Sequence, residues 1–165
     1  MALIKKNNMD SKKTVLVSGG AGYIGSHTAV ELLNAGYNVV IIDNLSNSEK
    51  DSVEGVKKIT GKDEAFEVVD TCDKAALRGI FDKYQFDSVI HFAAYKAVGE
   101  SMAEPLMYYQ NNLVSFMNIV EMMKEYNRPN ILFSSSTTLY GDAKHLPLTK
   151  QTPRQPSTSP YGNTE

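Results

Sequence analysis

Three glycines that follow a short β-branched run have the spacing that phosphate binding requires. Gly19, Gly22 and Gly25 form a G-x-x-G-x-x-G pattern directly after Val15–Ser18, and a helix-compatible stretch follows them. Glycine has no Cβ, so its backbone can approach a ligand closely, and a helix N-terminus offers free N–H groups to anionic oxygens. The pattern alone also fits a plain turn. The strand before it and the helix after it favour a dinucleotide-binding loop.

Asp43 supplies the acidic residue that such a loop requires. It follows the apolar run Val39–Ile42 and lies close to the usual distance of about 20 residues beyond Gly25. A carboxylate there accepts hydrogen bonds from the ribose hydroxyls of adenosine and repels a 2′-phosphate, which favours NAD over NADP. A strand-end aspartate that only caps a turn is the alternative, and the neighbouring glycine pattern makes it the weaker one.

The composition is typical of one globular domain. Of 165 residues, 42% are hydrophobic and 22% are charged, so the chain is large enough to bury a core. The net charge of −2 gives no support for a nucleic acid or an anionic membrane as a partner. No apolar stretch in the sequence reaches membrane-spanning length.

The cysteine and histidine content indicates the cellular compartment and argues against a metal site. The single cysteine, Cys72, excludes an intramolecular disulfide and agrees with a reducing compartment, so we expect a cytoplasmic protein. Residues 1–12 lack the apolar region of a signal peptide and are expected to form a flexible arm. His27, His91 and His145 are scattered without metal-ligand spacing, so no metal site is expected.

Short apolar runs alternate with helix-compatible stretches along the chain. Strands are expected at 14–18, 38–42, 66–69, 87–92 and 130–133, and helices near 23–35, 48–60, 73–84 and 104–126. The alternation favours parallel strands, and the near-continuous apolar residues in the runs indicate a sheet covered on both faces. With right-handed crossovers, the fold class is α/β, a Rossmann-like doubly wound parallel sheet with the strand order 3-2-1-4-5. Ligands of such sheets bind beyond the carboxyl ends of the strands.

The helix expected at 104–126 is apolar on more than one side. A first stripe at helical spacing consists of Leu106, Tyr109, Leu113, Phe116, Met117, Val120 and Met123, and a second flank of Tyr108, Val114, Ile119, Met122 and Tyr126. One side faces the sheet. We expect the second flank to exceed what one sheet face covers and to require a partner.

Several segments, taken together, match one enzyme family. They are Gly19–Thr28, Asp43–Ser48, Lys96–Ser101, Pro105–Asn112, Phe133–Ser136 and Pro160–Gly162. These segments resemble the UDP-glucose 4-epimerase (UDP-galactose 4-epimerase) family of extended short-chain dehydrogenases/reductases. The Lys96–Ser101 segment is specific to the epimerases, whereas the whole superfamily shares the glycine motif. The resemblance covers about the first half of the family's length. Residues 13–165 are therefore expected to be an incomplete NAD-binding Rossmann domain, truncated before the later strands and without the UDP-sugar-binding half.

The resemblance also implies a reaction and its residues. The family oxidises the C4 hydroxyl of a UDP-sugar by hydride transfer to tightly held NAD, then returns the hydride to the opposite face of the 4-keto sugar. Tyr161 is then the base, Ser136 hydrogen-bonds the reacting hydroxyl, and Asp70 accepts from the adenine amine. The residues implied to bind NAD are Gly19, Gly22, Tyr23, Ile24, Gly25, Asp43, Asn44, Leu45, Ser46, Asn47, Ser48, Asp70, Thr71, Phe92, Ala93, Ala94, Tyr95, Lys96 and Asn111. Two copies of the helix at 104–126 would contribute to a homodimer.

Some positions depart from the family pattern. The superfamily has lysine four residues after the catalytic tyrosine, where this chain has Glu165. A lysine lowers the pKa of the tyrosine and a glutamate raises it, so this chain alone is expected to be inactive. Tyr95 and Thr137 also differ from the family residues and adjoin the expected nicotinamide site.

Two alternatives to an epimerase remain open. One is another NAD-dependent nucleotide-sugar enzyme of the superfamily, a dehydratase or a decarboxylase. The other is a non-catalytic dinucleotide-binding or dimerising remnant, which the Glu165 replacement favours. Ser136 and Tyr161 do not separate the epimerase from the remnant.

Overall fold

The computed structural model describes residues 12–143 and 146–165. All of the expected N-terminal arm except Lys12, and also His145, lie outside the described residues. The strands are β1 (Thr14–Ser18), β2 (Asn38–Asp43), β3 (Ala65–Val68), β4 (Ser88–His91) and β5 (Ile131–Phe133). The α-helices are α1 (Tyr23–Asn34), α2 (Lys50–Thr60), α3 (Lys74–Lys83), α4 (Val98–Ala103), α5 (Pro105–Tyr108), α6 (Val114–Glu125) and α7 (Pro160–Asn163). A π-helical turn, η1 (Tyr109–Leu113), joins α5 to α6, and η2 (Thr137–Tyr140) is a 3₁₀ turn.

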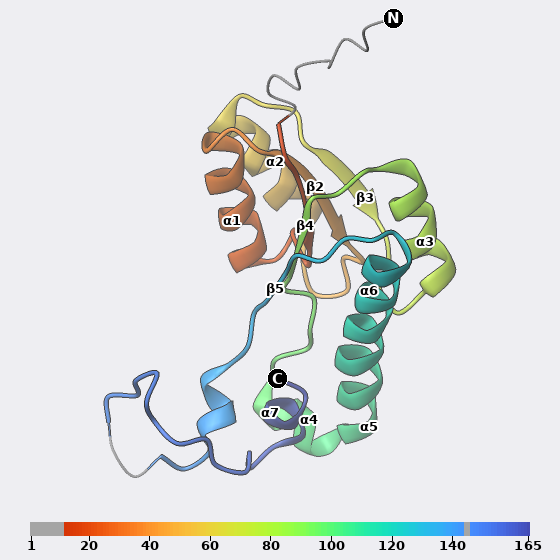
Figure 1. Cartoon of the computed structure of the whole chain (residues 1–165). Helices are drawn as coiled ribbons and strands as arrows, with labels where there is room; N and C mark the ends of the chain where they lie inside the picture. The colour runs from red at the N-terminus through yellow and green to blue at the C-terminus, as the bar shows by residue number, and fades with distance from the viewer. Residues whose placement is uncertain (1–11, 144–145) are drawn as a thin grey trace, which may run out of the picture.

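The strands form one parallel sheet with the order β3-β2-β1-β4-β5 (Figure 1). The expected doubly wound fold and its strand order are therefore confirmed. Helices α1 and α2 cover one face, and α3 and α6 cover the other. Successive side chains of a strand point to opposite faces, so Leu16 packs with α3 and α6 while Val15 and Val17 pack with α1 and α2. This two-sided burial explains why the central runs are apolar without alternation.

The outer strands do not share this cover. Val68 on β3 is 62% exposed and Leu132 on β5 is 54% exposed. The expectation that the whole sheet is covered on both faces is therefore wrong at its edges. An edge strand has a neighbour on one side only, so fewer elements pack over it within the described residues.

The region at 105–125 is one continuous helical segment, but the assignment of its faces from sequence is wrong. Tyr108, Ile119 and Met122, placed on the uncovered flank, are fully buried, and Ile119 and Met122 belong to the sheet core. The exposed side consists instead of Leu106, Leu113, Met117 and Val120. All four belong to the first stripe expected from the sequence, so the two faces are exchanged on both sides of η1. Helical spacing defines two apolar faces but not which of them packs on the sheet.

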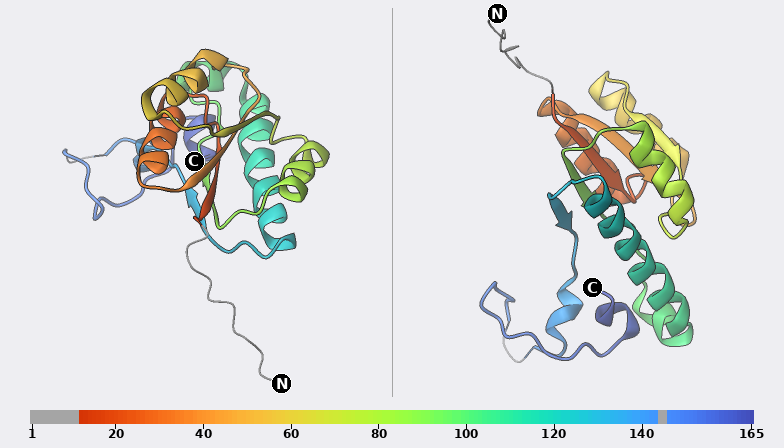
Figure 2. Two further views of the ribbon diagram at one scale, coloured as in Figure 1. Left: turned by 90° about the horizontal axis from the view of Figure 1, so that it is seen from above. Right: turned by 45° about the vertical axis from the view of Figure 1, so that its right-hand side comes forward.

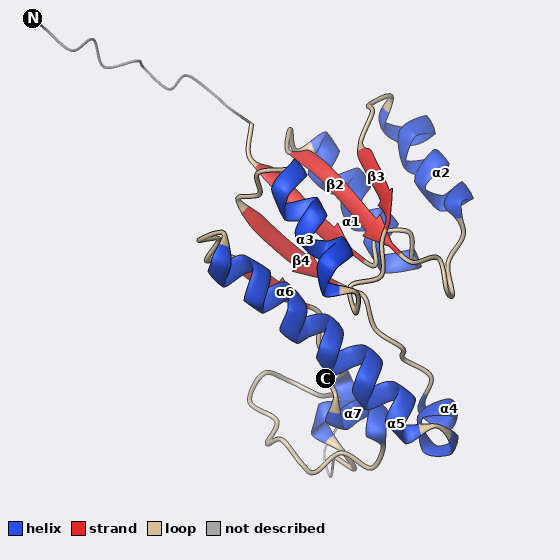
Figure 3. Cartoon of the chain, turned by 90° about the vertical axis from the view of Figure 1, so that its right-hand side faces the viewer, coloured by secondary structure: helices blue, strands red, loops and turns tan. Residues whose placement is uncertain are grey.

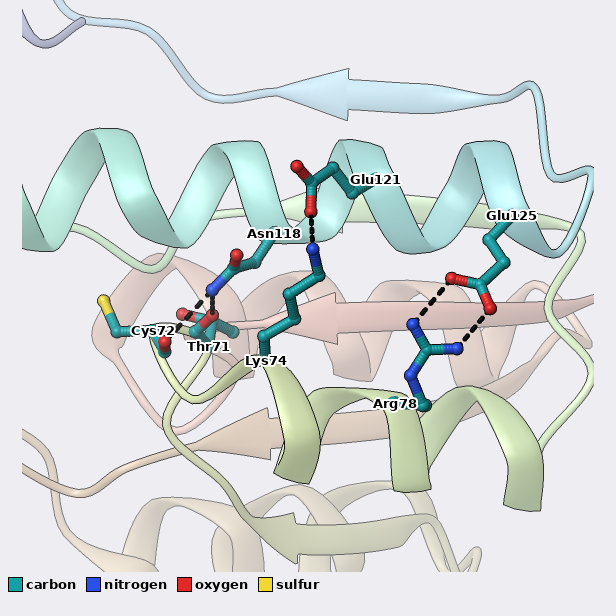
Figure 4. Close-up of polar contacts among 7 residues, drawn as sticks. All are labelled: Thr71, Cys72, Lys74, Arg78, Asn118, Glu121 and Glu125. Carbon is teal, nitrogen blue, oxygen red and sulfur yellow. Dashed lines mark hydrogen bonds and ion pairs between the residues drawn. The ribbon is translucent and has the colours of Figure 1, made fainter.

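Helix α6 is joined to α3 by polar contacts (Figure 4). Lys74 pairs with Glu121, and Arg78 pairs with Glu125. These pairs are exposed and contribute little to stability. Asn118 differs because it is buried, and its Nδ2 donates to the carbonyl oxygens of Thr71 at 2.9 Å and Cys72 at 3.1 Å. These bonds fix the loop between β3 and α3, which lies beside the cavity described below.

The last part of the chain lies beyond the carboxyl ends of the strands (Figures 2 and 3). After β5 the chain passes through η2 and a long loop, then returns so that α7 packs against α4 and α5. Ser159 caps α7 by accepting a hydrogen bond from the backbone N–H of Gly162 at 3.1 Å. This return brings residues near 161–165 back toward the carboxyl edge of the sheet.

Candidate functional site

A cavity of about 450 Å³ lies at the carboxyl edge of the sheet. It is lined by segments that follow all five strands, by residues of η1 and α6, and by residues of the C-terminal segment. The lining residues are Gly19, Gly22, Tyr23, Ile24, Gly25, Ile42, Asp43, Asn44, Ser46, Asn47, Val69, Thr71, Phe92, Ala93, Ala94, Tyr95, Lys96, Asn111, Ser115, Ser134, Ser135, Ser136, Tyr161 and Glu165. The crevice expected for a doubly wound sheet is thus present where the strand order reverses.

The glycine loop forms one wall because close packing of backbone leaves no room for side chains. A Cβ on Gly25 would lie 2.3 Å from the carbonyl oxygen of Gly19. Gly19 itself has φ +71°, and its Cβ would lie 2.6 Å from the nitrogen of Ala93. Helix α1 has no side-chain N-cap, and its first residues, Tyr23 and Ile24, line the cavity. The arrangement can therefore bind an anionic group with backbone N–H groups and the helix dipole.

Asp43 is held rigidly at the adjacent end of the cavity. Its carboxylate accepts from the backbone N–H of Ala21 at 3.0 Å, from that of Leu45 at 2.9 Å and from the Ser48 hydroxyl at 2.8 Å. Leu45 adopts φ +56°, a conformation that costs energy for a residue with a side chain. The loop therefore accepts local strain to surround the carboxylate, and a carboxylate with about four lone-pair sites keeps capacity for a ligand hydroxyl.

The opposite end of the cavity holds the expected catalytic pair. Ser136 caps η2, and its hydroxyl accepts from the backbone N–H of Thr138 at 3.3 Å and from the Thr138 hydroxyl at 3.0 Å. Burial raises the pKa of Tyr161, a hydrogen bond with Ser136 lowers it, and the charge of Glu165 raises it again. Burial also raises the pKa of the Glu165 carboxyl to about 7. The phenol of Tyr161 is accordingly protonated at neutral pH.

Comparison with known proteins assigns the family. A family model described as GDP-mannose 4,6 dehydratase matches residues 16–164. The chain belongs to the GDP-mannose 4,6 dehydratase family.

Within the GDP-mannose 4,6 dehydratase family, several of the similar proteins are UDP-glucose 4-epimerases. The UDP-glucose 4-epimerase of Caenorhabditis elegans is 49% identical over 160 residues, which are 92% of this chain and 46% of that protein. The UDP-glucose 4-epimerase of Bacillus subtilis is 50% identical over 151 residues, which are 92% of this chain and 44% of that protein. The resemblance seen in the sequence motifs is confirmed. The chain spans about half the length of the curated relatives it matches.

A solved structure agrees with these relatives. The crystal structure of UDP-glucose 4-epimerase from Bifidobacterium longum, in complex with NAD⁺ and UDP, superposes with a TM-score of 0.90 at 48% identity. The superposition covers 92% of this chain and 45% of that one. The described fold is therefore that of the N-terminal half of such an enzyme.

In this member of the GDP-mannose 4,6 dehydratase family, most expected site residues share the one cavity. Three do not line it: Leu45, Ser48 and Asp70. Leu45 and Ser48 donate to Asp43 from behind, and the Asp70 carboxylate accepts from Cys72 N–H at 2.8 Å and from Asn44 at 3.4 Å. In this structure their hydrogen bonds hold the loops that carry the lining residues.

Sequence reasoning missed a buried polar chain beneath the cavity. The Ser18 hydroxyl lies 2.6 Å from Nδ1 of His91, and Nε2 of His91 lies 3.5 Å from the Ser115 hydroxyl. The Ser115 hydroxyl is in turn 2.6 Å from that of Thr71, and both residues line the cavity. Burial lowers the pKa of His91 to about 4, so the imidazole is neutral. A histidine and a serine at the ends of apolar strands were the available signal, since the two strands pair with Ser18 opposite His91.

Asn112 is a second residue that sequence reasoning did not single out. Its Oδ1 accepts from the backbone N–H of Tyr95 at 2.8 Å, and its Nδ2 donates to the Tyr95 carbonyl at 3.0 Å and to the Thr164 hydroxyl at 2.9 Å. The Thr164 hydroxyl donates to the carbonyl of Tyr161 at 2.7 Å. Asn112 therefore connects the loop after β4 to the turn that carries Tyr161. The available signals were its place in the family motif Pro105–Asn112, for which no role was assigned to it, and its polarity within an apolar helix.

Two results concern the described residues as a whole. Within 12–143 and 146–165, no helix is long and apolar enough to cross a membrane. In the same residues, no group of three or more histidine, cysteine, aspartate or glutamate side chains is arranged to hold a metal ion.

Proposed function

We propose that this chain is the NAD-binding part of a UDP-glucose 4-epimerase, which interconverts UDP-glucose and UDP-galactose through a 4-keto intermediate. The observation that carries the proposal is a single cavity. It joins a phosphate-binding glycine loop and Asp43 at one end to Ser136 and Tyr161 at the other. The UDP-glucose 4-epimerases among the relatives, and the B. longum structure with NAD⁺ and UDP, support it.

The residues present fit a dinucleotide. The backbone cradle at Gly19 and Gly25 leaves no room for a Cβ, and the uncapped N-terminus of α1 suits a pyrophosphate. Asp43 accepts from the ribose hydroxyls of adenosine and repels a 2′-phosphate, which selects NAD over NADP. Lys96 presents an ammonium group to the same cavity and serves phosphate or ribose oxygens. When bound, NAD supplies the hydride acceptor.

Tyr161 and Ser136, at the end of the cavity opposite Asp43, handle the transfer of the sugar hydroxyl proton. The phenolate form of Tyr161 would take the proton of the sugar 4-hydroxyl, and Ser136 would donate a hydrogen bond that orients the reacting oxygen. Asn112 joins the loop that carries Tyr95 to the turn that carries Thr164, so Tyr161 keeps its position relative to the loop after β4. In the second half of the reaction, the same phenol would return the proton to the sugar oxygen.

A homodimer is part of the proposal. The exposed stripe Leu106, Leu113, Met117 and Val120 runs along α5, η1 and α6. Four apolar side chains along one helical face favour a protein partner. A second copy of this helix offers the same face.

The single cysteine, Cys72, supports a reducing, cytoplasmic setting.

A second candidate function rests on one observation. The Glu165 carboxylate lies near Tyr161 and raises the pKa of the Tyr161 phenol, although burial is the larger cause of that shift. This charge opposes formation of the phenolate that a base requires. A non-catalytic dinucleotide-binding module is therefore the alternative to the epimerase.

Calorimetric titration of the chain with NAD⁺ and NADP⁺ tests the cofactor assignment. We expect NAD⁺ to bind at least about tenfold more tightly, and Asp43→Asn to reduce this difference. Glu104→Gln, an exposed carboxylate outside the cavity, is the matched control and is expected to leave it unchanged. Equal or tighter binding of NADP⁺ would overturn the assignment.

A coupled assay with UDP-galactose tests the non-catalytic alternative. Because of Glu165, we expect turnover by this chain alone to be no greater than that of Tyr161→Phe. Turnover well above that control would reject the non-catalytic alternative and would show that the carboxylate does not disable the base.

A further inference from the structure

Glu165 places a carboxyl group in the wall of the cavity, at the end that holds Tyr161 and Ser136. Its position is fixed from two sides. The backbone carbonyl of Glu165 accepts a hydrogen bond from the Ser135 hydroxyl at 3.2 Å. The preceding residue, Thr164, is buried and accepts from Asn112 at 2.9 Å. The residue is partly buried and faces the cavity as part of a structured turn.

The formal charges around the cavity are few. Among the described lining residues, the side-chain carboxylates are Asp43 and Glu165 and the side-chain ammonium group is Lys96. Asp43 already accepts from three protein donors and lies at the adenosine end. Glu165 is therefore the carboxylate that acts at the other end of the site.

The arrangement fixes which part of a dinucleotide meets this carboxylate. This step rests on the proposed function. With the adenosine ribose at Asp43 and the pyrophosphate at the N-terminus of α1, the second half of the dinucleotide extends toward Tyr161 and Glu165. The nicotinamide ring carries a positive charge in the oxidised cofactor and none in the reduced cofactor, and the two forms share every other group.

We propose that Glu165 is a specificity-determining residue for the redox state of the cofactor, and that its carboxylate makes the site prefer NAD⁺ over NADH. A carboxylate stabilises a neighbouring cation and has no such effect on a neutral ring. For charges about 7 Å apart, an effective dielectric between that of water and 20 gives a preference of about 3- to 50-fold. A site with this preference holds the oxidised form in which the proposed reaction cycle begins.

The experiment compares the dissociation constants of NAD⁺ and NADH for the same protein at pH 8. This pH is chosen because burial raises the pKa of Glu165 to about 7. The phenol of Tyr161, whose pKa burial raises further, stays protonated at this pH. The quantity measured is the ratio of the two constants, which cancels any effect of a variant on the shared parts of the cofactor.

Glu165→Gln removes the charge and keeps the shape, and we expect it to lower the preference for NAD⁺ by about 3- to 50-fold. Glu165→Lys is expected to lower it further, and Glu104→Gln to leave it unchanged. A ratio that is the same in Glu165→Gln and in the unaltered protein overturns the inference. Equal weakening of both forms also overturns it, because that result indicates a structural role.

The same measurement separates this inference from the proposed function. If the unaltered chain binds neither NAD⁺ nor NADH, both fail. If it binds both forms and Glu165→Gln leaves their ratio unchanged, the dinucleotide site stands and only the role of Glu165 is rejected.

Discussion

Tyr161 and Glu165 line the same cavity, and the charge of Glu165 raises the pKa of the Tyr161 phenol. Burial is the larger cause of the same shift, and the hydrogen bond with Ser136 opposes both. The base proposed for the reaction is thus surrounded by one group that favours its ionised form and one that opposes it. The balance between them can be altered one residue at a time.

Replacing Glu165 by lysine is expected to lower the pKa of Tyr161, because a cation replaces an anion beside the phenol. The measurement is an NMR titration of tyrosines labelled at the ζ-carbon, with Tyr161→Phe to assign the resonance. Ser136→Ala is the companion variant and is expected to shift the pKa upward, since it removes the lowering hydrogen bond. An unchanged Tyr161 titration in Glu165→Lys would show that the two side chains do not interact.

Acid stability is expected to depend on His91. Burial lowers its pKa from 6.5 to about 4 in the folded protein, so the unfolded chain binds the proton more readily than the folded one. The contribution to stability is complete above pH 6.5 and is lost as the pH falls toward 4. The shift corresponds to about 3 kcal/mol. Urea unfolding between pH 4 and 8 measures the slope.

His91→Gln is the variant for that experiment, because it cannot titrate. The absolute stability of the variant is not the readout, since the variant also loses the bond to Ser18. What is compared is the loss of stability between pH 6.5 and 4, which should be smaller by about 3 kcal/mol in His91→Gln. Parallel pH profiles would contradict the assignment.

Two glycines of the loop are expected to respond differently to alanine. Gly25→Ala puts a Cβ 2.3 Å from the Gly19 carbonyl oxygen and 2.7 Å from the Gly20 Cα, so we expect a loss of about 3 kcal/mol in unfolding free energy. At Gly22 the nearest atom is 3.3 Å away, so folding should change by less than about 1 kcal/mol. Because Gly22 lines the cavity, we expect NAD⁺ binding to weaken by about tenfold or more.

Gly79→Ala is the control for this pair, because a Cβ there meets no atom within 4 Å. It lies within α3 and should stabilise the fold by about 0.5–1 kcal/mol. Thermal melts measure the change in folding stability, and calorimetry measures the change in NAD⁺ binding. A Gly22→Ala variant that binds NAD⁺ as tightly as the unaltered chain would place the ligand elsewhere.

Self-association is expected through the exposed stripe of α5, η1 and α6. Met117 is 52% exposed at its centre, and Met117→Lys should lower the association constant because it places a charge in an apolar contact. Val68→Lys is the control, since Val68 is 62% exposed but lies on β3. Sedimentation at several concentrations decides the matter. A monomer at high concentration in the unaltered chain would reject the proposed dimer face.

The order of the elements and the position of the phosphate-binding loop could be predicted from the sequence. Both are local features of the sequence. The apolar run Val15–Ser18 favours a strand, and the glycines within Gly19–Gly25 permit a tight turn and close approach of the backbone to a ligand. The parallel sheet and its order followed from alternation and from the handedness of crossovers. Asp43 followed from its distance along the chain, so its place in the cavity could be predicted.

The tertiary structure alone decided which faces are covered and which polar groups meet. Both apolar faces of the segment from Pro105 to Glu125 have helical spacing, and only the packing shows that Ile119 and Met122 face the sheet while Met117 and Val120 are exposed. Asn112 joins Tyr95 to Thr164 across a long stretch of chain, and Glu165 reaches the cavity only because the chain returns after β5. Such contacts depend on packing between segments that are distant in the sequence, so the local conformational preferences of the residues do not predict them.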